Sequence, residues 1–420
     1  MKYRPRLIDS ELKEDLEAFG AVLIVGPKWC GKTTTASQVA KSTLRMQDRD
    51  TREKNIALAE LKPSELLVGD NPRLIDEWQT APQLWDSVRL SVDLRDEPGL
   101  YILTGSTTVD RERIDHSGAG RIDTLKMGTM SLFESGDSIG SVSLKEMFDG
   151  TSNVSGMSGA TVEKMAFLTI RGGWPQSVDR SENVARRHVR SYCETIIKVE
   201  VIGSDGKRRN PYKMRSVLKS LSRNISSPLS KTAIIDDVNS KEGTSITMNT
   251  LNDYLDALRD IYVLDDIPAW NPNLRSSASA RAADTICMCD PAIAAYFLGA
   301  SQRDLMTDPK TFGLLFESLV IRDLRVYAQS LDGDIFRYRD STGLEADAII
   351  HLHDGRWGAL EIKLGDAWVD KGAHNLLKLR KKVNTDDMGE PSFLAVITGS
   401  DCAYTRADGV HVIPITCLRN

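Results

Sequence analysis

The sequence predicts an α/β protein with more than one domain, and three of its features point to this class. Near the N-terminus, an apolar run at residues 21–25 leads into a glycine-containing loop and then into a segment with a helical pattern. The middle of the chain carries apolar residues at helical spacing. In the last third, strand-like apolar runs stand between two helical patterns. A chain of 420 residues is long enough for two or three cores.

The N-terminal loop, GPKWCGKTT, has the spacing of a phosphate-binding loop, because it fits the pattern G-x-x-x-x-G-K-S/T. We expect residues 22–25 to form a buried strand and residues 33–41 a helix, so that loop N–H groups and the helix N-terminus face an anion. Lys32 is expected to contact the β- and γ-phosphates of ATP, and Thr33 to hold Mg²⁺. The predicted nucleotide-binding residues are Gly26, Pro27, Lys28, Trp29, Cys30, Gly31, Lys32, Thr33 and Thr34.

Two carboxylates follow a second strand-like segment. In the stretch PRLIDEW, a short apolar run leads into Asp76 and Glu77. Asp76 is predicted to bind the water shell of Mg²⁺, and Glu77 to act as the base that polarises the attacking water. An acidic helix N-cap is the alternative interpretation of this pair, since residues 79–88 have a helical pattern.

A third segment, YILTGS, predicts another buried strand, which ends at Ser106. Ser106 is a candidate to orient the attacking water or to contact the γ-phosphate. Arg111, Arg113 and Arg121 follow. Arg121 is the candidate arginine finger, which would reach the nucleotide of a neighbouring subunit. The other two arginines remain alternatives, and an ordinary solvated arginine is the alternative for each of the three.

Together with the later stretch GAGRIDTLKMGTMSLFE, the phosphate-binding loop and the stretches LIDEWQ and ILTGS resemble a group of prokaryotic AAA-type P-loop ATPases. In that group the C-terminal half is a domain of unknown function. The resemblance extends from Tyr3 to the end of the chain and includes the RGGWP turn at residues 171–175. It implies an N-terminal P-loop AAA+-like ATPase domain, which we place at residues 1–150, with ATP and Mg²⁺ as cofactors.

The composition is that of an ordinary globular protein, with 41% hydrophobic and 27% charged residues and a net charge of −5. No apolar run reaches the roughly 18 residues that a membrane-spanning helix needs, and the N-terminus lacks a secretory signal pattern. The six cysteines are scattered without metal-binding spacing. We therefore expect a reduced, cytoplasmic protein with no membrane partner.

The middle of the chain, residues 160–300, predicts a helical domain that contains a winged helix. Helical patterns at residues 217–223, 231–238 and 247–259 precede two short strands in IYVLDDIPAW. The third helix carries small polar residues rather than arginines, which favours contacts with DNA backbone or shape over sequence readout. Packing or protein contact is the alternative role. Residues 137–159, rich in serine and glycine, predict a flexible connection.

The C-terminal part, residues 305–420, predicts the order helix, three strands, helix, strand. Asp347 lies within one strand, and Glu361 and Lys363 share a face of the next. This set resembles the restriction-endonuclease-like superfamily, with its Asp and Glu-x-Lys motif. The resemblance implies that Asp347 and Glu361 are metal ligands, that Lys363 activates water and that Glu317 is an accessory ligand. A DNA-binding or structural remnant, or a plain Glu361–Lys363 ion pair, is the alternative.

The three predicted domains combine most naturally on DNA, so we expect an ATP-hydrolysing DNA motor, such as a helicase, a translocase or a remodeller of duplex or branched DNA. The trans finger implies a homo-oligomer, for example a hexameric ring. An ATP-gated, Mg²⁺-dependent nuclease and a nucleotide-dependent protein-interaction switch are the alternatives. Two basic clusters are candidates for phosphate contacts. They consist of Lys207, Arg208 and Arg209, and of Lys378, Arg380, Lys381 and Lys382.

Overall fold

The computed structural model describes residues 3–106, 117–198, 209–227, 230–272, 284–384 and 388–420. By its internal contacts the chain divides into two units. The first consists of residues 1–129, 199–209 and 256–263, and the second of residues 130–198, 210–255 and 264–420. The predicted division into three domains at 1–150, 160–300 and 305–420 stays a prediction. Within the described ranges, no helix is long and apolar enough to cross a membrane.

The first unit is built on a five-stranded sheet in the order β2-β3-β4-β1-β5, and every pairing in it is parallel. The carboxyl ends of all its strands therefore lie along one edge. The phosphate-binding loop follows β1 at this edge, Glu77 follows β3, and Ser106 follows β4. The strands are β1 (Ala21–Val25), β2 (Ser42–Arg45), β3 (Arg73–Asp76), β4 (Tyr101–Gly105) and β5 (Ile122–Lys126).

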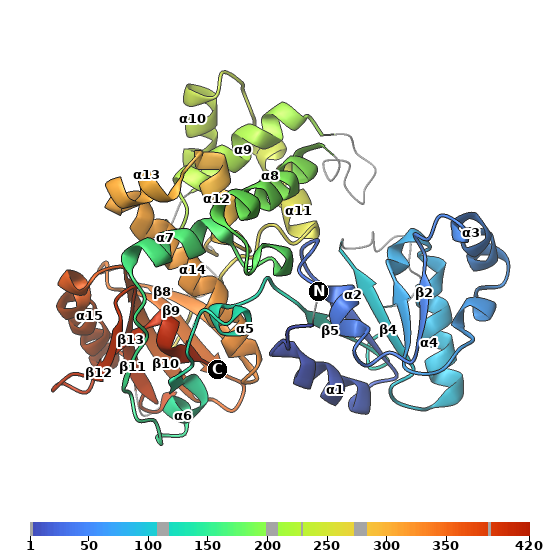
Figure 1. Cartoon of the computed structure of the whole chain (residues 1–420), viewed down its shortest axis with the longest axis horizontal. Helices are drawn as coiled ribbons and strands as arrows, with labels where there is room; N and C mark the ends of the chain where they lie inside the picture. Colours follow the sequence, from blue (N-terminus) through green and yellow to red (C-terminus); the bar gives the residue numbers. More distant parts are fainter. Residues whose placement is uncertain (1–2, 107–116, 199–208, 228–229, 273–283, 385–387) are drawn as a thin grey trace. The chain divides into compact units, whose positions relative to one another are not determined.

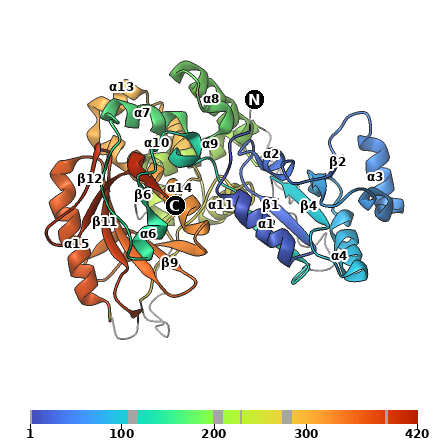
Figure 2. The same ribbon diagram turned by 60° about the horizontal axis from the view of Figure 1, so that its bottom comes forward.

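Helices cover both faces of this sheet (Figures 1 and 2). Helix α1 packs its buried Leu12 and Leu16 with Val22 and Ile24 of β1, whereas Leu84 and Val88 of α4 join the core on the other face. The alternation along β1 follows from the two-residue period of a strand. The helices are α1 (Ile8–Ala18), α2 (Lys32–Ala36), α3 (Arg52–Leu61) and α4 (Gln83–Arg95), with 3₁₀ turns η1 (Pro63–Leu67) and η2 (Trp78–Thr80).

The helix after the phosphate-binding loop is shorter than predicted. It ends at Ala36 rather than continuing to residue 41. The backbone N–H of Lys41 already donates to the carbonyl of Pro72, which begins the pairing of β2 with β3. The chain must leave the helix to make that pairing, so residues 37–39 form a turn instead.

The helical middle is confirmed. Three of its helices, α9, α10 and α11, occupy the positions predicted for the winged helix. The predicted hairpin within residues 261–270 is wrong, because Leu264 pairs with Met288 and Ile267 with Thr285 in antiparallel bridges. Arg325 Nη1 donates to Asp265 Oδ1 at 2.9 Å, and this hydrogen bond fixes the segment that was predicted to form the hairpin turn. The helices are α7 (Val162–Arg171), α8 (Glu182–Lys198), α9 (Pro211–Arg223), α10 (Lys231–Lys241), α11 (Met248–Asp260), α12 (Pro291–Leu298) and α13 (Gln302–Thr307).

The C-terminal order of helix, three strands, helix and strand is confirmed. Strands β8, β9 and β10 form an antiparallel meander, and β10, β11 and β13 run parallel. The full sheet has the order β7-β12-β13-β11-β10-β9-β8, and α15 packs on it with Ala373, Leu376 and Leu379 (Figure 1). The elements are α14 (Pro309–Gln329), β8 (Gly333–Arg339), β9 (Glu345–Leu352), β10 (Trp357–Lys363), α15 (Val369–Lys382), β11 (Phe393–Thr398), β12 (Cys402–Thr405), β13 (His411–Pro414) and β14 (Leu418–Arg419).

The segment at residues 137–159 is not the flexible connection that its composition predicts. Its strand β6 pairs with β14, and its strand β7 pairs with β12 of the C-terminal sheet. Buried Val142, Leu144 and Phe148 anchor it, and the serine at position 143 caps a helix. The elements here are α5 (Leu132–Ser135), β6 (Val142–Ser143), α6 (Leu144–Phe148) and β7 (Gly156–Met157).

Candidate functional site

The phosphate-binding loop has a backbone shape that requires its two glycines. Gly26 has φ 146° and Gly31 has φ 113°, both in the region that favours glycine. A Cβ atom at Gly26 would lie 2.0 Å from the carbonyl oxygen of Met127, so no side chain fits there. The spacing in the sequence pattern thus corresponds to two positions that only glycine can occupy without strain.

Lys32 lies at the start of α2 and is buried. Its Nζ donates to the carbonyl oxygens of Gly26, at 2.8 Å, and Pro27, at 3.0 Å. The ammonium therefore lies against the carbonyl oxygens of the phosphate-binding loop itself. Because an ionised phosphate oxygen is a stronger acceptor for an ammonium than a carbonyl is, a bound triphosphate would displace these two bonds.

Thr33 and Asp76, the two predicted Mg²⁺ residues, lie in direct contact. Thr33 Oγ1 donates to Asp76 Oδ1 at 2.7 Å, although the residues belong to α2 and β3. Thr104 Oγ1, from β4, donates to the same carboxylate oxygen at 2.7 Å. A hydroxyl and a carboxylate are oxygen donors of the kind that Mg²⁺ prefers, so these residues fit the ion. The sequence patterns did not reveal Thr104, whose hydrogen bond orients the carboxylate of Asp76.

Glu77 does not cap a helix. Only the 3₁₀ turn η2 follows it, its side chain makes no capping hydrogen bond, and α4 begins only at Gln83. Glu77 instead adopts a left-handed backbone conformation, with φ 57°, and its Oε2 accepts from Gln79 Nε2. Gln79 thus orients the candidate base, a role that the sequence did not reveal.

Ser106 is buried, with 2% of its surface exposed, at the end of β4. Among the parts of the chain that the structure describes, its Oγ has no hydrogen-bond partner. The preceding residue, Gly105, lies against Gln79, since a Cβ atom added there would be 3.1 Å from Gln79 Oε1. A buried hydroxyl without a partner calls for an explanation, which a catalytic role would supply.

Arg121 lies at the opposite edge of the sheet from the phosphate-binding loop. Its carbonyl accepts from the N–H of Ala21, the first residue of β1, whereas the loop follows the last. Its Nε contacts Asp93 Oδ1 at 2.6 Å. The structure therefore does not bring Arg121 to the nucleotide site of its own chain. The alternative fingers, Arg111 and Arg113, lie outside the described residues.

The four residues predicted for the nuclease-like site do come together in the C-terminal sheet. Lys363 Nζ lies 2.9 Å from Asp347 Oδ2 and 2.5 Å from Glu361 Oε2. Glu317, from α14, reaches the group through Arg337, whose guanidinium lies 2.9 Å from Glu317 Oε1 and 3.8 Å from Asp347 Oδ1. Arg337 was not foreseen, and it adds a second cation to the cluster.

The electrostatics of this cluster reflect burial and mutual repulsion of the carboxylates. Burial and the charge of Asp347 raise the pKa of Glu317 to about 8, and the same two causes raise the pKa of Glu361 to about 7. Burial disfavours the charge of Lys363, but Asp347 and Glu361 outweigh it and raise its pKa. In the described part of the chain, no group of three or more His, Cys, Asp or Glu side chains could hold a metal ion.

The predicted basic clusters are only partly available to a partner. Lys207 and Arg208 lie outside the described residues, and Arg209 is buried. The predicted residues of α15 are all exposed, but two of them are paired within the chain. Arg380 contacts Glu390 at 2.7 Å and Lys382 contacts Asp340 at 2.5 Å. The exposed residues Lys378 and Lys381 complete this cluster.

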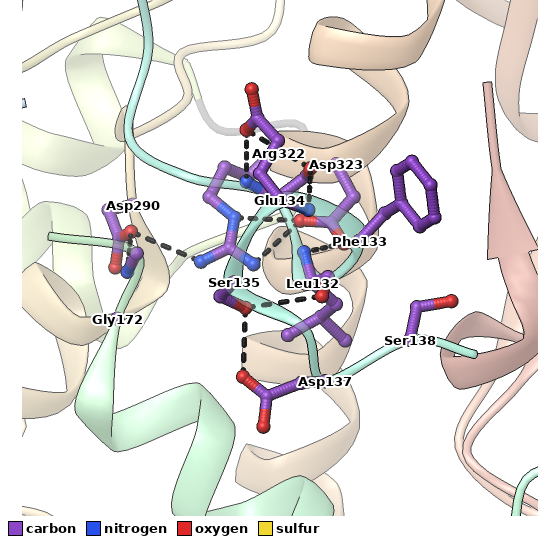
Figure 3. A network of polar contacts seen from close by, with 12 residues as sticks. Leu132, Phe133, Glu134, Ser135, Asp137, Ser138, Gly172, Asp290, Arg322 and Asp323 are labelled. Carbon is purple, nitrogen blue, oxygen red and sulfur yellow. Dashed lines mark hydrogen bonds and ion pairs between the residues drawn. The ribbon is translucent and has the colours of Figure 1, made fainter. Parts of the chain in front are cut away.

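A buried ionic network in the second unit was not predicted (Figure 3). Arg322 of α14 contacts Asp323 Oδ1 at 2.6 Å and Asp290 Oδ2 at 3.3 Å, and all three side chains are buried. Asp323 also accepts from the N–H of Leu132, at 2.9 Å, and Asp290 from the N–H of Gly173, at 2.8 Å. The SLFE and RGGWP stretches, which carried part of the family resemblance, meet here. Their presence in the resemblance was the sequence feature that could have pointed to this network.

Three parts of the chain match described protein families. Residues 18–135 match the family described as "AAA domain". Residues 162–304 match "Domain of unknown function (DUF8612)", and residues 312–418 match "Domain of unknown function (DUF4143)". Two uncharacterized proteins, from Mycobacterium bovis and Mycobacterium tuberculosis, are each 23% identical to this chain over 357 residues. The matched region covers 84% of this chain and 72% of each relative.

The solved structures to which this chain is similar include the Walker-type ATPase of Pyrococcus abyssi. It is 14% identical with a TM-score of 0.34, and the match covers 71% of this chain and 99% of that structure. A mutant RuvB of Thermotoga maritima is 16% identical with a TM-score of 0.27 and covers 62% of this chain and 89% of its own.

The identity of the chain follows from its own site and from the family match. The AAA domain match spans the phosphate-binding loop, Asp76, Glu77 and Ser106, which lie along one edge of a parallel sheet. The C-terminal match spans the sheet that follows α14. The chain therefore carries an AAA-type P-loop ATPase domain, within residues 18–135, and a C-terminal domain of unknown function, within residues 312–418.

Proposed function

We propose that this ATPase is a motor that acts on DNA, as a homo-oligomer that uses Mg²⁺. The observation that carries the proposal is the combination, in one chain, of a phosphate-binding loop with the helices α9, α10 and α11 and the antiparallel bridges that follow them. Three helices followed by antiparallel pairing have the order of a winged helix, a module that docks on duplex DNA.

The roles in hydrolysis follow from the contacts at the sheet edge. The N–H groups of the loop and the ammonium of Lys32 would bind the phosphates. Thr33 and Asp76 would hold Mg²⁺, which when bound neutralises charge on the phosphates. Glu77, oriented by Gln79, would accept a proton from the attacking water, and the unpartnered hydroxyl of Ser106 would contact that water or the γ-phosphate.

The oligomer is supported by the place of Arg121. It stands at the sheet edge opposite the loop of its own chain, so any nucleotide that it contacts would belong to another subunit. A ring such as a hexamer would place each Arg121 beside the next site. Sedimentation in the presence of ATP, Mg²⁺ and DNA is expected to show a species larger than the monomer, and a monomer under all these conditions would contradict the proposal.

The DNA role is tested by the steady-state ATPase rate without DNA and with single-stranded, linear duplex and four-way-junction DNA. We expect at least one DNA form to raise the rate severalfold, with a stimulation that falls as salt is added, because phosphate contacts release counterions. Lys32→Ala measured in parallel sets the background. An active enzyme whose rate ignores every DNA form at low salt would contradict the motor and would favour a nucleotide-dependent protein-interaction switch.

A Mg²⁺-dependent nuclease is the second candidate, and one observation favours it. Asp347, Glu361 and Lys363, far apart from Glu317 in sequence, assemble with it in the C-terminal sheet. The two cations Arg337 and Lys363 now neutralise this group, so a metal ion would have to displace at least one of them. Labelled DNA incubated with Mg²⁺ or Mn²⁺ tests the candidate. Cleavage by the wild type that Asp347→Asn removes would support it, and an inactive wild type would end it.

A further inference from the structure

The segment before α1 reaches the back of the phosphate-binding loop. Its Arg6 has only 6% of its surface exposed and lies outside the region that matches the AAA domain. Its Nη1 donates to the carbonyl oxygen of Cys30 at 2.8 Å, and its Nη2 donates to the carbonyl oxygen of Gly128 at 3.0 Å. One guanidinium thus joins the loop to the chain that leaves β5.

The segment that carries Arg6 is itself held in place. The backbone N–H of Arg6 donates to Asp9 Oδ2 at 2.9 Å, and the hydroxyl of Tyr3 donates to Asp9 Oδ1 at 2.5 Å. The Tyr3 hydroxyl also lies 3.1 Å from Thr35 Oγ1, on the helix that follows the loop. Asp9, in the first turn of α1, therefore anchors both ends of a strap that runs from Tyr3 to Arg6.

The backbone carbonyl of Cys30 needs a hydrogen-bond donor from outside the loop. A loop that turns its N–H groups toward an anion turns carbonyl oxygens the other way, and a buried carbonyl needs a donor. Cys30 is fully buried, and Arg6 supplies that donor from outside the loop. On the same side, Cys30 Sγ donates to the carbonyl of Met127 at 3.5 Å, which gives a second, weaker tie to the end of β5.

We propose that Arg6 is a positioning residue for ATP binding, because it holds the phosphate-binding loop in the shape that accepts phosphates. Without Arg6, the loop would spend part of its time in shapes whose N–H groups do not converge. The apparent dissociation constant of a ligand rises in inverse proportion to the fraction of protein that can bind it. Saturating ATP restores the binding shape, so the maximal rate is preserved. The inference rests on the phosphate-binding loop as the nucleotide site and not on any role with DNA.

The test compares Arg6→Ala and Arg6→Lys with the wild type in the full chain, without DNA. We expect Arg6→Ala to raise the KM for ATP and the Kd of a fluorescent ADP analogue about tenfold or more, as for lost hydrogen bonds from a charged donor, while kcat stays within about twofold. Arg6→Lys, which can reach one carbonyl but not both, is expected to give an intermediate KM. Lys13→Ala removes an exposed positive charge from α1 and is expected to match the wild type.

The split between KM and kcat separates positioning from a structural role. A variant that is merely less folded loses kcat per milligram and keeps its KM, and that result would overturn the proposal, as would Arg6→Ala with unchanged KM and kcat. If Arg6→Ala does not fold, Arg6→Lys decides, with a raised KM supporting the proposal and an unchanged one refuting it. If the Lys32→Ala variant hydrolyses ATP as fast as the wild type, the assignment of the nucleotide site itself is refuted.

Discussion

Lys32→Ala is expected to lower the maximal ATPase rate by about a hundredfold or more, the cost of removing a preorganised charge from the phosphates in the transition state. The ammonium of Lys32 lies within the loop, where it donates to the carbonyl oxygens of Gly26 and Pro27. The variant should fold, because the loss of two bonds to loop carbonyls leaves the sheet and its two cores unchanged. The measurement is phosphate release at saturating ATP and Mg²⁺.

Lys41→Ala is the matched control, since Lys41 is exposed just beyond α2 and only its backbone takes part in the β2–β3 pairing. It is expected to hydrolyse ATP at the wild-type rate. Asp76→Asn is a second probe, expected to shift the Mg²⁺ dependence to higher concentration because it removes the charge that Thr33 and Thr104 orient. Wild-type hydrolysis by Lys32→Ala would mean that the loop is not the catalytic site.

Arg322→Met is expected to destabilise the second unit by about 3–5 kcal/mol, the range for breaking a buried ion pair by removing one partner. The change leaves Asp290 and Asp323 buried without their cation, at the point where α12, α14, the RGGWP turn and the segment after β5 meet (Figure 3). Burial would then push the two carboxyl groups toward protonation. The measurement is urea-induced unfolding followed by circular dichroism.

The control for Arg322→Met is Arg303→Ala, which removes an exposed arginine of α13 and is expected to change stability by less than about 0.5 kcal/mol. The double variant Arg322→Met/Asp323→Asn is expected to recover part of the lost stability, because one uncompensated charge is gone. Equal unfolding midpoints for Arg322→Met and the wild type would show that the network contributes no net stability.

Local patterns determined a large part of this protein. The two glycines and Lys32 of the phosphate-binding loop could be recognised because their backbone requirements lie within nine consecutive residues. The order of elements from α14 to β11 could be read in the same way, since the periods of 3.6 and 2.0 are written into each segment. The assembly of Asp347, Glu361 and Lys363 followed from the alternation along two adjacent strands.

Contacts between residues far apart in the sequence could not be predicted from local patterns. Arg6 and Thr104 act on the loop and on Asp76 from elements distant in sequence, and no local period marks them. The segment at residues 137–159 reads as a linker, yet its strands find partners in β12 and β14, near the C-terminus. The contacts of Arg322 with Asp323 and Asp290 had no counterpart in the sequence patterns. A sequence determines which segments are helix, strand or phosphate-binding loop, because those preferences are local, whereas only the packed chain decides which buried charge meets which partner.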